Sequence, residues 1–170
     1  MISLFFLFSF SSKVLAQKEN EYQIKGLFVE RFTKFISWND SLSSVGHPFK
    51  ITVLGNNPFG NRLDIIYHNK FIQNRRVEIN YIGNIKQIQS PDILFICNSE
   101  KDQISRIIQK VSGKPVLTIA DSPGFAQKGV IINFFFTSDN RIHFEINPKH
   151  AILNQLKISR LLLNNAKLVL

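Results

Sequence analysis

The stretch from Pro115 to Asn147 constrains the fold more than any other part of the sequence. It opens with the apolar run Val116–Ala120, which is typical of a strand covered on both faces. Turn-forming residues follow at once and carry the chain out of the sheet. Two more strands are predicted at Val130–Phe136 and Arg141–Ile146, joined by a polar hairpin turn. The pattern therefore predicts a sheet with a buried central strand and a hairpin whose second strand is half exposed.

The rest of the chain is predicted to alternate strands and helices around this stretch. The expected strands are residues 49–54, 76–81 and 92–97, and the expected helices are residues 22–38, a short helix ending at 67, a helix ending near 111, and a single final helix over 148–170. Strands that alternate with helices and end in a hairpin indicate an α/β fold. We therefore expect a mixed, mostly parallel sheet with helices on both faces, plus a C-terminal β-hairpin and a covering helix.

The N-terminal residues 1–16 are predicted to be a signal peptide and are set apart from the fold. Ile2–Phe10 is an apolar run, and Val14–Ala16 resembles a cleavage site ahead of Gln17. The run is shorter than the ~20 apolar residues that a membrane span needs, although no Lys or Arg precedes it. The alternatives are a disordered apolar N-terminus and an uncleaved anchor. We predict export to the periplasm of one domain, residues 17–170.

The chain is basic, with 21 Lys and Arg against 12 Asp and Glu and a formal charge of +9. Removal of Lys13 with the signal peptide leaves 20 basic residues, and the charge becomes +8. In an exported protein this charge favours an anionic membrane face or an acidic partner surface, and no nucleic-acid partner is predicted. The alternative is that the charge only keeps the protein in solution.

The sequence carries no pattern that predicts catalysis, a cofactor or a metal site. The turn Gly55–Gly60 is followed by Asn61-Arg62 and not by the Lys and Ser or Thr of a phosphate-binding loop, so its glycines are interpreted as conformational. The four histidines lack metal-ligand spacing, and no serine lies in a G-x-S-x-G motif. A triad assembled from distant residues stays open, but no enzyme is predicted. The single cysteine, Cys97, is predicted to be a buried small hydrophobe, with a bridge between two chains as the alternative.

The strongest polar cluster follows the predicted central strand. Asp121 and Ser122 lie past the carboxyl end of that strand, where ligands of open α/β sheets bind, and Phe125 would add an aromatic surface. The alternative is that the two polar side chains satisfy loop amides while Phe125 plugs the edge of the sheet. Both interpretations stay open for these three candidate binding residues.

A second set of candidate residues lies at the end of the hairpin. Glu145 and Asn147 could contact the final helix, where Arg160 is a suitable partner. We expect a structural ion pair here, with ligand or partner binding by the three residues as the functional alternative.

Seven segments, in order along the mature chain, resemble one protein family. They are Gly26–Trp38, Ile51–Gly60, Ile93–Ile96, Val116–Ala126, Gly129–Ile132, Arg141–Asn147 and Leu156–Leu162. The family is that of the YfiR/HmsC-like periplasmic proteins. Each segment alone is weak evidence, but the ordered series is specific and covers nearly all of the mature chain.

The resemblance implies an exported α/β regulator without catalytic residues. The better-known members bind the periplasmic sensor domain of an inner-membrane diguanylate cyclase and hold the cyclase inactive, and its release raises cyclic di-GMP and promotes biofilm formation. Such members are described as dimers, and some carry disulfides that make them redox-sensitive. This sequence departs from them because Cys97 is its only cysteine, so intramolecular thiol switching is excluded.

These observations lead to one main functional hypothesis and two rivals. The main hypothesis is a periplasmic, homodimeric regulatory protein that docks on the outer domain of a membrane-bound diguanylate cyclase or sensor kinase and represses or modulates it, which would affect cyclic di-GMP and biofilm output. The first rival is a small-molecule receptor that uses the cleft at the carboxyl ends of the strands. The second is a hydrolase, which would require a pocket with a nucleophile and a base within hydrogen-bond reach.

Overall fold

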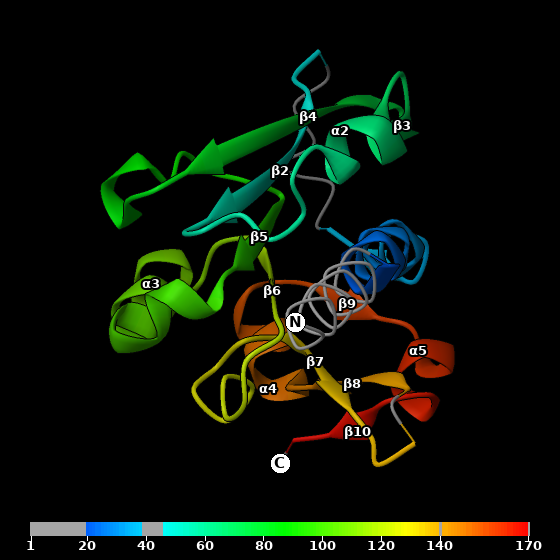
Figure 1. Cartoon of the computed structure of the whole chain (residues 1–170), viewed down its shortest axis with the longest axis vertical. Coiled ribbons are helices and arrows are strands. Elements are labelled where there is room, and N and C mark those ends of the chain that lie inside the picture. The colour runs from blue at the N-terminus through cyan, green and yellow to red at the C-terminus, as the bar shows by residue number, and fades with distance from the viewer. Residues whose placement is uncertain (1–19, 39–45, 140, 170) are drawn as a thin grey trace, which may run out of the picture.

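The main sheet of the protein is mixed and mostly parallel. A computed structural model describes residues 20–38, 46–139 and 141–169 (Figure 1), so the predicted signal peptide lies outside the described residues. Within them, eight strands form one sheet in the order β10-β8-β7-β6-β5-β2-β4-β3. The strands are β2 (Phe49–Leu54), β3 (Phe71–Ile72), β4 (Arg75–Ile82), β5 (Ile93–Ile96), β6 (Leu117–Ala120), β7 (Ile132–Phe136), β8 (Ile142–Ile146) and β10 (Lys167–Leu168). The neighbours from β4 to β7 are parallel, as are β8 and β10, whereas β7–β8 and β3–β4 are antiparallel.

The middle of the sheet is the part that the apolar runs predicted. Every residue of β5 and β6 is buried, which is the pattern of parallel strands covered on both faces. The hairpin of β7 and β8 is also confirmed, with Asn133 opposite Glu145 in its register. The predicted fold class is therefore correct.

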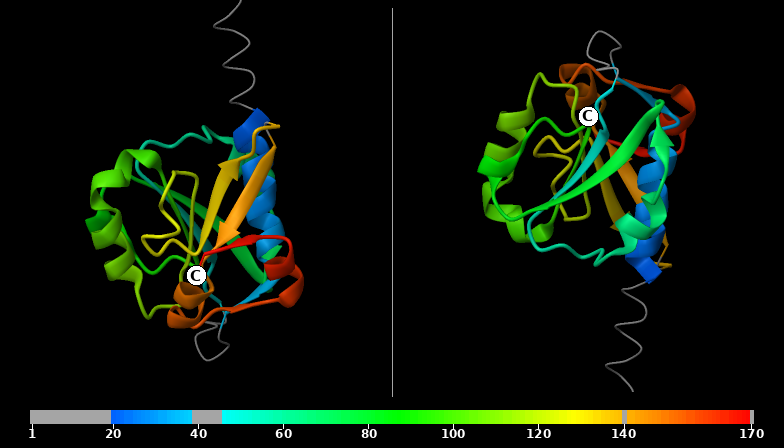
Figure 2. Two further views of the ribbon diagram at one scale, coloured as in Figure 1. Left: turned by 90° about the horizontal axis from the view of Figure 1, so that it is seen from below. Right: turned by 90° about the horizontal axis from the view of Figure 1, so that it is seen from above.

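Helices cover the sheet on both faces, as the two views of Figure 2 show. On one face lie the N-terminal helix, described over residues 20–32, and α2 (Arg62–Tyr67). The larger apolar core fills this side, and Phe32 of the helix stacks on Phe134 of β7 with ring centroids 5.7 Å apart. On the other face α3 (Ile104–Val111), which follows the 3₁₀ helix η3 (Asn98–Gln103), buries an isoleucine-rich stripe in a second core. A second 3₁₀ helix, η2 (Ile85–Gln87), follows β4.

The first helix is shorter than predicted. The expectation of a helix over residues 22–38 is wrong at its end, because residues 33–35 form a turn and Ile36–Ser37 form the strand β1. This strand pairs antiparallel with β9 (Lys157–Ile158), and the Ser159 amide donates to the Phe35 carbonyl at 2.9 Å. Phe35 and Ile36 continue the apolar spacing of the helix, and only the distant partner strand reveals the change of structure.

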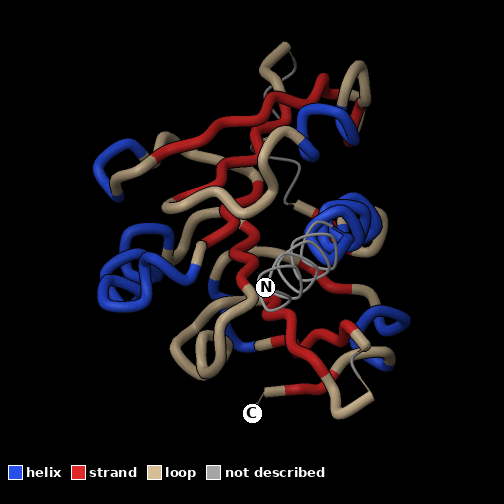
Figure 3. The backbone as a smooth tube through the Cα atoms, viewed as in Figure 1, coloured by secondary structure: helices blue, strands red, loops and turns tan. Residues whose placement is uncertain are grey.

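The single final helix is also wrong. The C-terminal segment is divided into α4 (Pro148–Leu153), β9, α5 (Arg160–Asn164) and β10, and the alternation of helix and strand is visible in Figure 3. The helix cannot continue after α4 because Gln155 has a positive φ of 59°. The chain then pairs with β1 and, after α5, returns to pair with β8. The apolar residues of this segment are thereby spread over four short elements.

Candidate functional site

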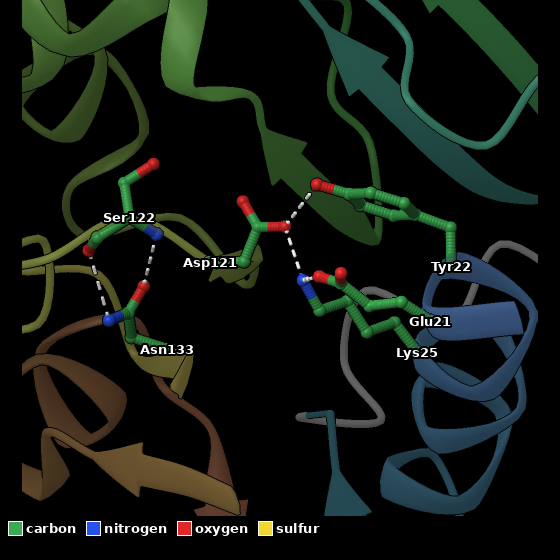
Figure 4. Close-up of polar contacts among 6 residues, drawn as sticks. All are labelled: Glu21, Tyr22, Lys25, Asp121, Ser122 and Asn133. Atoms are coloured by element: carbon green, nitrogen blue, oxygen red, sulfur yellow. Dashed lines mark hydrogen bonds and ion pairs between the residues drawn. The ribbon is translucent and has the colours of Figure 1, made fainter. Parts of the chain in front are cut away.

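Asp121 holds the N-terminal helix to the carboxyl end of β6. The Oδ2 atom of Asp121 accepts two hydrogen bonds, one from the Tyr22 hydroxyl at 2.8 Å and one from the Lys25 ammonium at 2.7 Å (Figure 4). Lys25 also forms an ion pair with Glu21, one helical turn earlier. The four side chains form a charged network between the sheet and a helix almost 100 residues away in sequence.

Most of this network is removed from water. The side chain of Lys25 is 3 % exposed and that of Asp121 is 7 % exposed, whereas Glu21 reaches the surface. The Lys25 ammonium lies 4.4 Å from the centroid of the Tyr22 ring, which adds a cation–π contact. Because a buried charge is tolerated only when it is paired and hydrogen-bonded, each member depends on the others. Burial, and then the charge of Asp121, raise the pKa of Tyr22 well above its ordinary value, so Tyr22 remains a neutral donor.

Of the four residues in this network, sequence reasoning singled out only Asp121. Lys25 looks from the sequence like a solvent-exposed residue of the first helix, but the structure buries it. No local signal marks Lys25: Ile24 before it is exposed, and Gly26 after it is buried so close to α2 that a Cβ atom would lie 2.7 Å from Ile66.

Cys97 lies near this network as an unreactive thiol. It is buried in the larger core, which confirms the prediction of a small hydrophobic residue. Burial, and then the charges of Asp121 and Glu100, raise the pKa of Cys97 to about 12. Only the thiolate form of cysteine acts as a nucleophile or a metal ligand. Because Cys97 keeps its proton at physiological pH, it acts as neither.

Ser122, the next residue along the chain, belongs to a different network. Its side chain does not meet Tyr22 or Lys25 (Figure 4), and among the described residues its buried hydroxyl has no hydrogen-bond partner. Its backbone amide and carbonyl are bonded by the side chain of Asn133, at 3.2 and 3.1 Å. Asn133 also donates to a carboxylate oxygen of Glu145 at 3.0 Å. This neutral donor bridges β6, β7 and β8.

The other predicted site residues lie apart from Asp121. Phe125 is buried in the core beneath α3, which agrees with the interpretation that it packs against the sheet and not with the one in which it adds an aromatic surface. Asn147 caps α4 by accepting from the His150 amide and donates to the Ala126 carbonyl. Arg160 is exposed on α5, and among the described residues it forms no ion pair with Glu145. The expected structural ion pair is therefore wrong, because Asn133 takes the place of Arg160.

The topological switch point of the sheet lies between β2 and β5, and not beside Asp121. Their crossover helices, α2 and α3, lie on opposite faces, which is the arrangement that opens a ligand crevice in α/β sheets. Here the crevice is filled by protein. The Ser99 hydroxyl accepts from the Asn56 amide, and a Cβ atom on Gly55 would lie 2.3 Å from it. Gly55 has a φ of 100°, so the conformational interpretation of the Gly55–Gly60 turn is confirmed.

A groove adjoins the charged network on the outer side of the N-terminal helix. One cavity of about 410 Å³ lies between this helix and the β7–β8 hairpin, and a second of about 400 Å³ lies along the helix itself. The apolar side chains of this helix–hairpin groove are Ile24, Leu27, Phe28, Phe136 and Ile142. Charged residues surround them: Glu21, Glu30, Arg31, Lys34 and Arg141.

The described residues offer no cluster of three or more His, Cys, Asp or Glu that could hold a metal ion. None of their helices is long and apolar enough to cross a membrane. What these residues do form is a structural charge network that supports an apolar groove with a charged rim.

Comparison with known proteins agrees with the sequence motifs. A model of the YfiR/HmsC-like family matches residues 22–167, which is most of the chain. The chain belongs to the YfiR/HmsC-like family. This family is regulatory and non-catalytic, and it is known for periplasmic proteins of cyclic di-GMP signalling that partner with membrane cyclases.

The fold of this YfiR/HmsC-like chain recurs in a solved structure. The crystal structure of a conserved domain protein from Vibrio cholerae O1 biovar El Tor str. N16961 superposes with a TM-score of 0.50 at 12 % identity. The match covers 71 % of this chain and 54 % of that chain, so the likeness concerns about half of the other protein and shows the fold alone. Among curated proteins, none matches the sequence significantly.

Proposed function

We propose that this chain is a periplasmic regulatory protein that docks on the outer domain of a membrane-bound diguanylate cyclase or sensor kinase and represses or modulates it. The family supports the regulatory and cyclic di-GMP theme. The helix–hairpin groove is the observation that carries the docking step, because it is an apolar surface that the described part of the chain leaves uncovered.

The groove has the composition of a protein interface. Leu27 and Phe136 are each 46 % exposed, and both line it. Interfaces combine an apolar centre with a polar rim, and Glu21, Arg31 and Arg141 provide such a rim here. The charged network beneath the groove fixes the helix against the sheet, so that the docking surface is preformed.

Substitution in the groove tests the proposal. Leu27→Glu and Phe136→Glu place a charge where the partner would bury apolar surface, and we expect the loss of an interface centre to weaken docking roughly 30-fold or more. The measurement is recovery of a diguanylate cyclase or sensor kinase after mild crosslinking in cells, together with the cellular level of cyclic di-GMP. The matched control is Ile65→Glu, because the Ile65 side chain is 67 % exposed on α2 and lies outside the groove.

Two results would contradict the proposal. If the unaltered chain recovers no membrane signalling enzyme, docking on such an enzyme is wrong. If Leu27→Glu and Phe136→Glu behave like Ile65→Glu in both measurements, the groove is not the docking surface.

A further inference from the structure

The C-terminal segment, residues 147–169, differs from the rest of the chain in charge. It contains Lys149, Lys157, Arg160 and Lys167 but neither Asp nor Glu. The carboxylate that precedes it, Glu145, is buried and bonded to Asn133, so it does not offset the basic groups at the surface. This segment therefore presents only positive side-chain charge.

The same segment exposes large aliphatic side chains. Ile152 is 75 % exposed, Leu153 51 %, Leu161 60 % and Leu168 45 %. The fold explains why, since the short helices bury little of themselves: Ala151 is the buried residue of α4 and Leu162 that of α5. Four of the ten large hydrophobic side chains that are exposed among the described residues thus lie within this short segment.

The helices and the last strand that carry most of these residues lie at one end of the molecule. In Figure 1 α4, α5 and β10 lie together at the lower end, and the left view of Figure 2 shows this end facing the reader. The opposite end carries α2 and β3, where Ile65 and Phe71 are also exposed but carboxylates are present at Asp64 and Glu78. Exposed apolar surface is common to both ends, whereas the segment 147–169 itself carries only basic charged side chains.

We propose that this C-terminal face, formed by residues 147–169, binds the surface of an anionic lipid bilayer. Basic side chains interspersed with exposed aliphatic ones are the composition of interfacial membrane contacts, in which the cations meet lipid phosphates and the aliphatic groups enter the headgroup boundary. Protein interfaces are depleted in lysine, and this face has three. The charge complementarity thus favours lipid as the occupant, and the contact is separate from the helix–hairpin groove.

Sedimentation with vesicles tests this proposal without any protein partner. The purified chain beginning at Gln17 is mixed with phosphatidylglycerol–phosphatidylethanolamine vesicles or with phosphatidylcholine vesicles, so that the apolar run of residues 1–16 does not contribute. We expect binding to the anionic vesicles only, and weaker binding at 1 M salt, where charges are screened beyond about 3 Å. Binding to both kinds of vesicle alike, or to neither, would overturn the proposal.

Two variants locate the contact. Lys149→Glu/Arg160→Glu places acidic residues in the first turns of α4 and α5, which suits a helix N-terminus and so preserves folding. Each basic residue near an anionic surface strengthens binding about fivefold, so the loss of two should weaken binding about 25-fold, and the two added carboxylates should weaken it further. Ile152→Ser/Leu153→Ser should bind more weakly at both salt concentrations, while the control Ile65→Ser/Phe71→Ser should bind as the unaltered chain does.

Other occupants are separated by the same samples. If the C-terminal variants bind vesicles normally but change the mass measured by sedimentation velocity, the face is an interface between copies of this chain and the proposal is wrong. If they bind vesicles normally yet lose a protein partner in cells, the face is a protein-docking surface and the proposal is equally wrong.

Discussion

Asp121 and Ser122 are neighbours in sequence, but they serve opposite sides of the sheet. Asp121 turns toward the N-terminal helix and joins a charged network with Lys25, whereas Ser122 turns away and its backbone is bonded by the amide of Asn133 (Figure 4). The first network joins two separate elements through buried charges. The second links adjacent strands through a neutral side chain. The difference indicates that the charged side tolerates substitution far less, because a charge left without its partner cannot be rehydrated.

The largest effect should follow from Lys25→Ala. The substitution leaves the Asp121 carboxylate buried without a cation, and breaking a buried pair costs about 3–5 kcal/mol of the free energy of unfolding. Urea denaturation at pH 7 measures it. The control Lys34→Ala, an exposed position of the same segment, should change the free energy by no more than about 0.5 kcal/mol. A loss below about 1 kcal/mol for Lys25→Ala would remove the contrast between the two networks.

Asn133→Leu should have the next largest effect. It replaces the amide by an apolar side chain of similar size. Glu145 and the Ser122 carbonyl then lose their donor, and the Ser122 amide loses its acceptor. Unsatisfied buried groups of this kind cost about 1–3 kcal/mol. The same denaturation measurement applies, and a loss larger than that of Lys25→Ala would show that the neutral network is the more important of the two.

Tyr22→Phe should have a smaller effect on the charged side. It removes only the hydroxyl that donates to Asp121 and keeps the ring beneath Lys25. A hydrogen bond to a charged group contributes about 1.5–3 kcal/mol, and the lower end applies because Tyr22 is only partly buried. If Tyr22→Phe and Lys25→Ala destabilise the protein equally, the hydroxyl and not the ion pair holds Asp121.

The smallest effect concerns Cys97, whose pKa is raised by burial and by the charges of Asp121 and Glu100. The folded state keeps the thiol proton up to about pH 12, while the ordinary pKa is 9.0, so the folded state binds more protons between these values. Stability from this group is full below pH 9 and is lost as the pH rises through that window. The free energy of unfolding should therefore fall more steeply from pH 9 to pH 11 in the unaltered protein than in Cys97→Ala. Parallel curves would show that Cys97 titrates normally.

Sequence reasoning succeeded where local pattern decides structure. The apolar runs of β5 and β6 and the alternation in β8 predicted the centre of the sheet and the hairpin, because burial on one or two faces fixes those patterns. It failed where a distant partner decides. Lys25 looks like a solvent-exposed helix residue until Asp121 is placed beside it. Lys157-Ile158 likewise looks helical, and only its pairing with β1 shows that it is a strand.

The candidate site follows the same division. Asp121 was predicted from its place after a buried strand, and the structure gives it a role in the charged network. Glu145 and Asn147 were predicted as polar residues at the hairpin end, but their partners, Asn133 and the Ala126 carbonyl, are neutral groups that no charge pattern reveals. The groove was missed because its apolar residues come from the helix stripe and the hairpin, each of which looks like ordinary core.

The short pairing of β1 with β9 has a mechanical consequence. It ties the end of the N-terminal helix to the strand between α4 and α5 through backbone hydrogen bonds. A molecule resting on a bilayer through α4 and α5 would therefore hold the helix, and the groove along it, at a set height and tilt above the lipid. The protein would then reach a membrane receptor by diffusion in two dimensions instead of three, with the groove already in a fixed orientation.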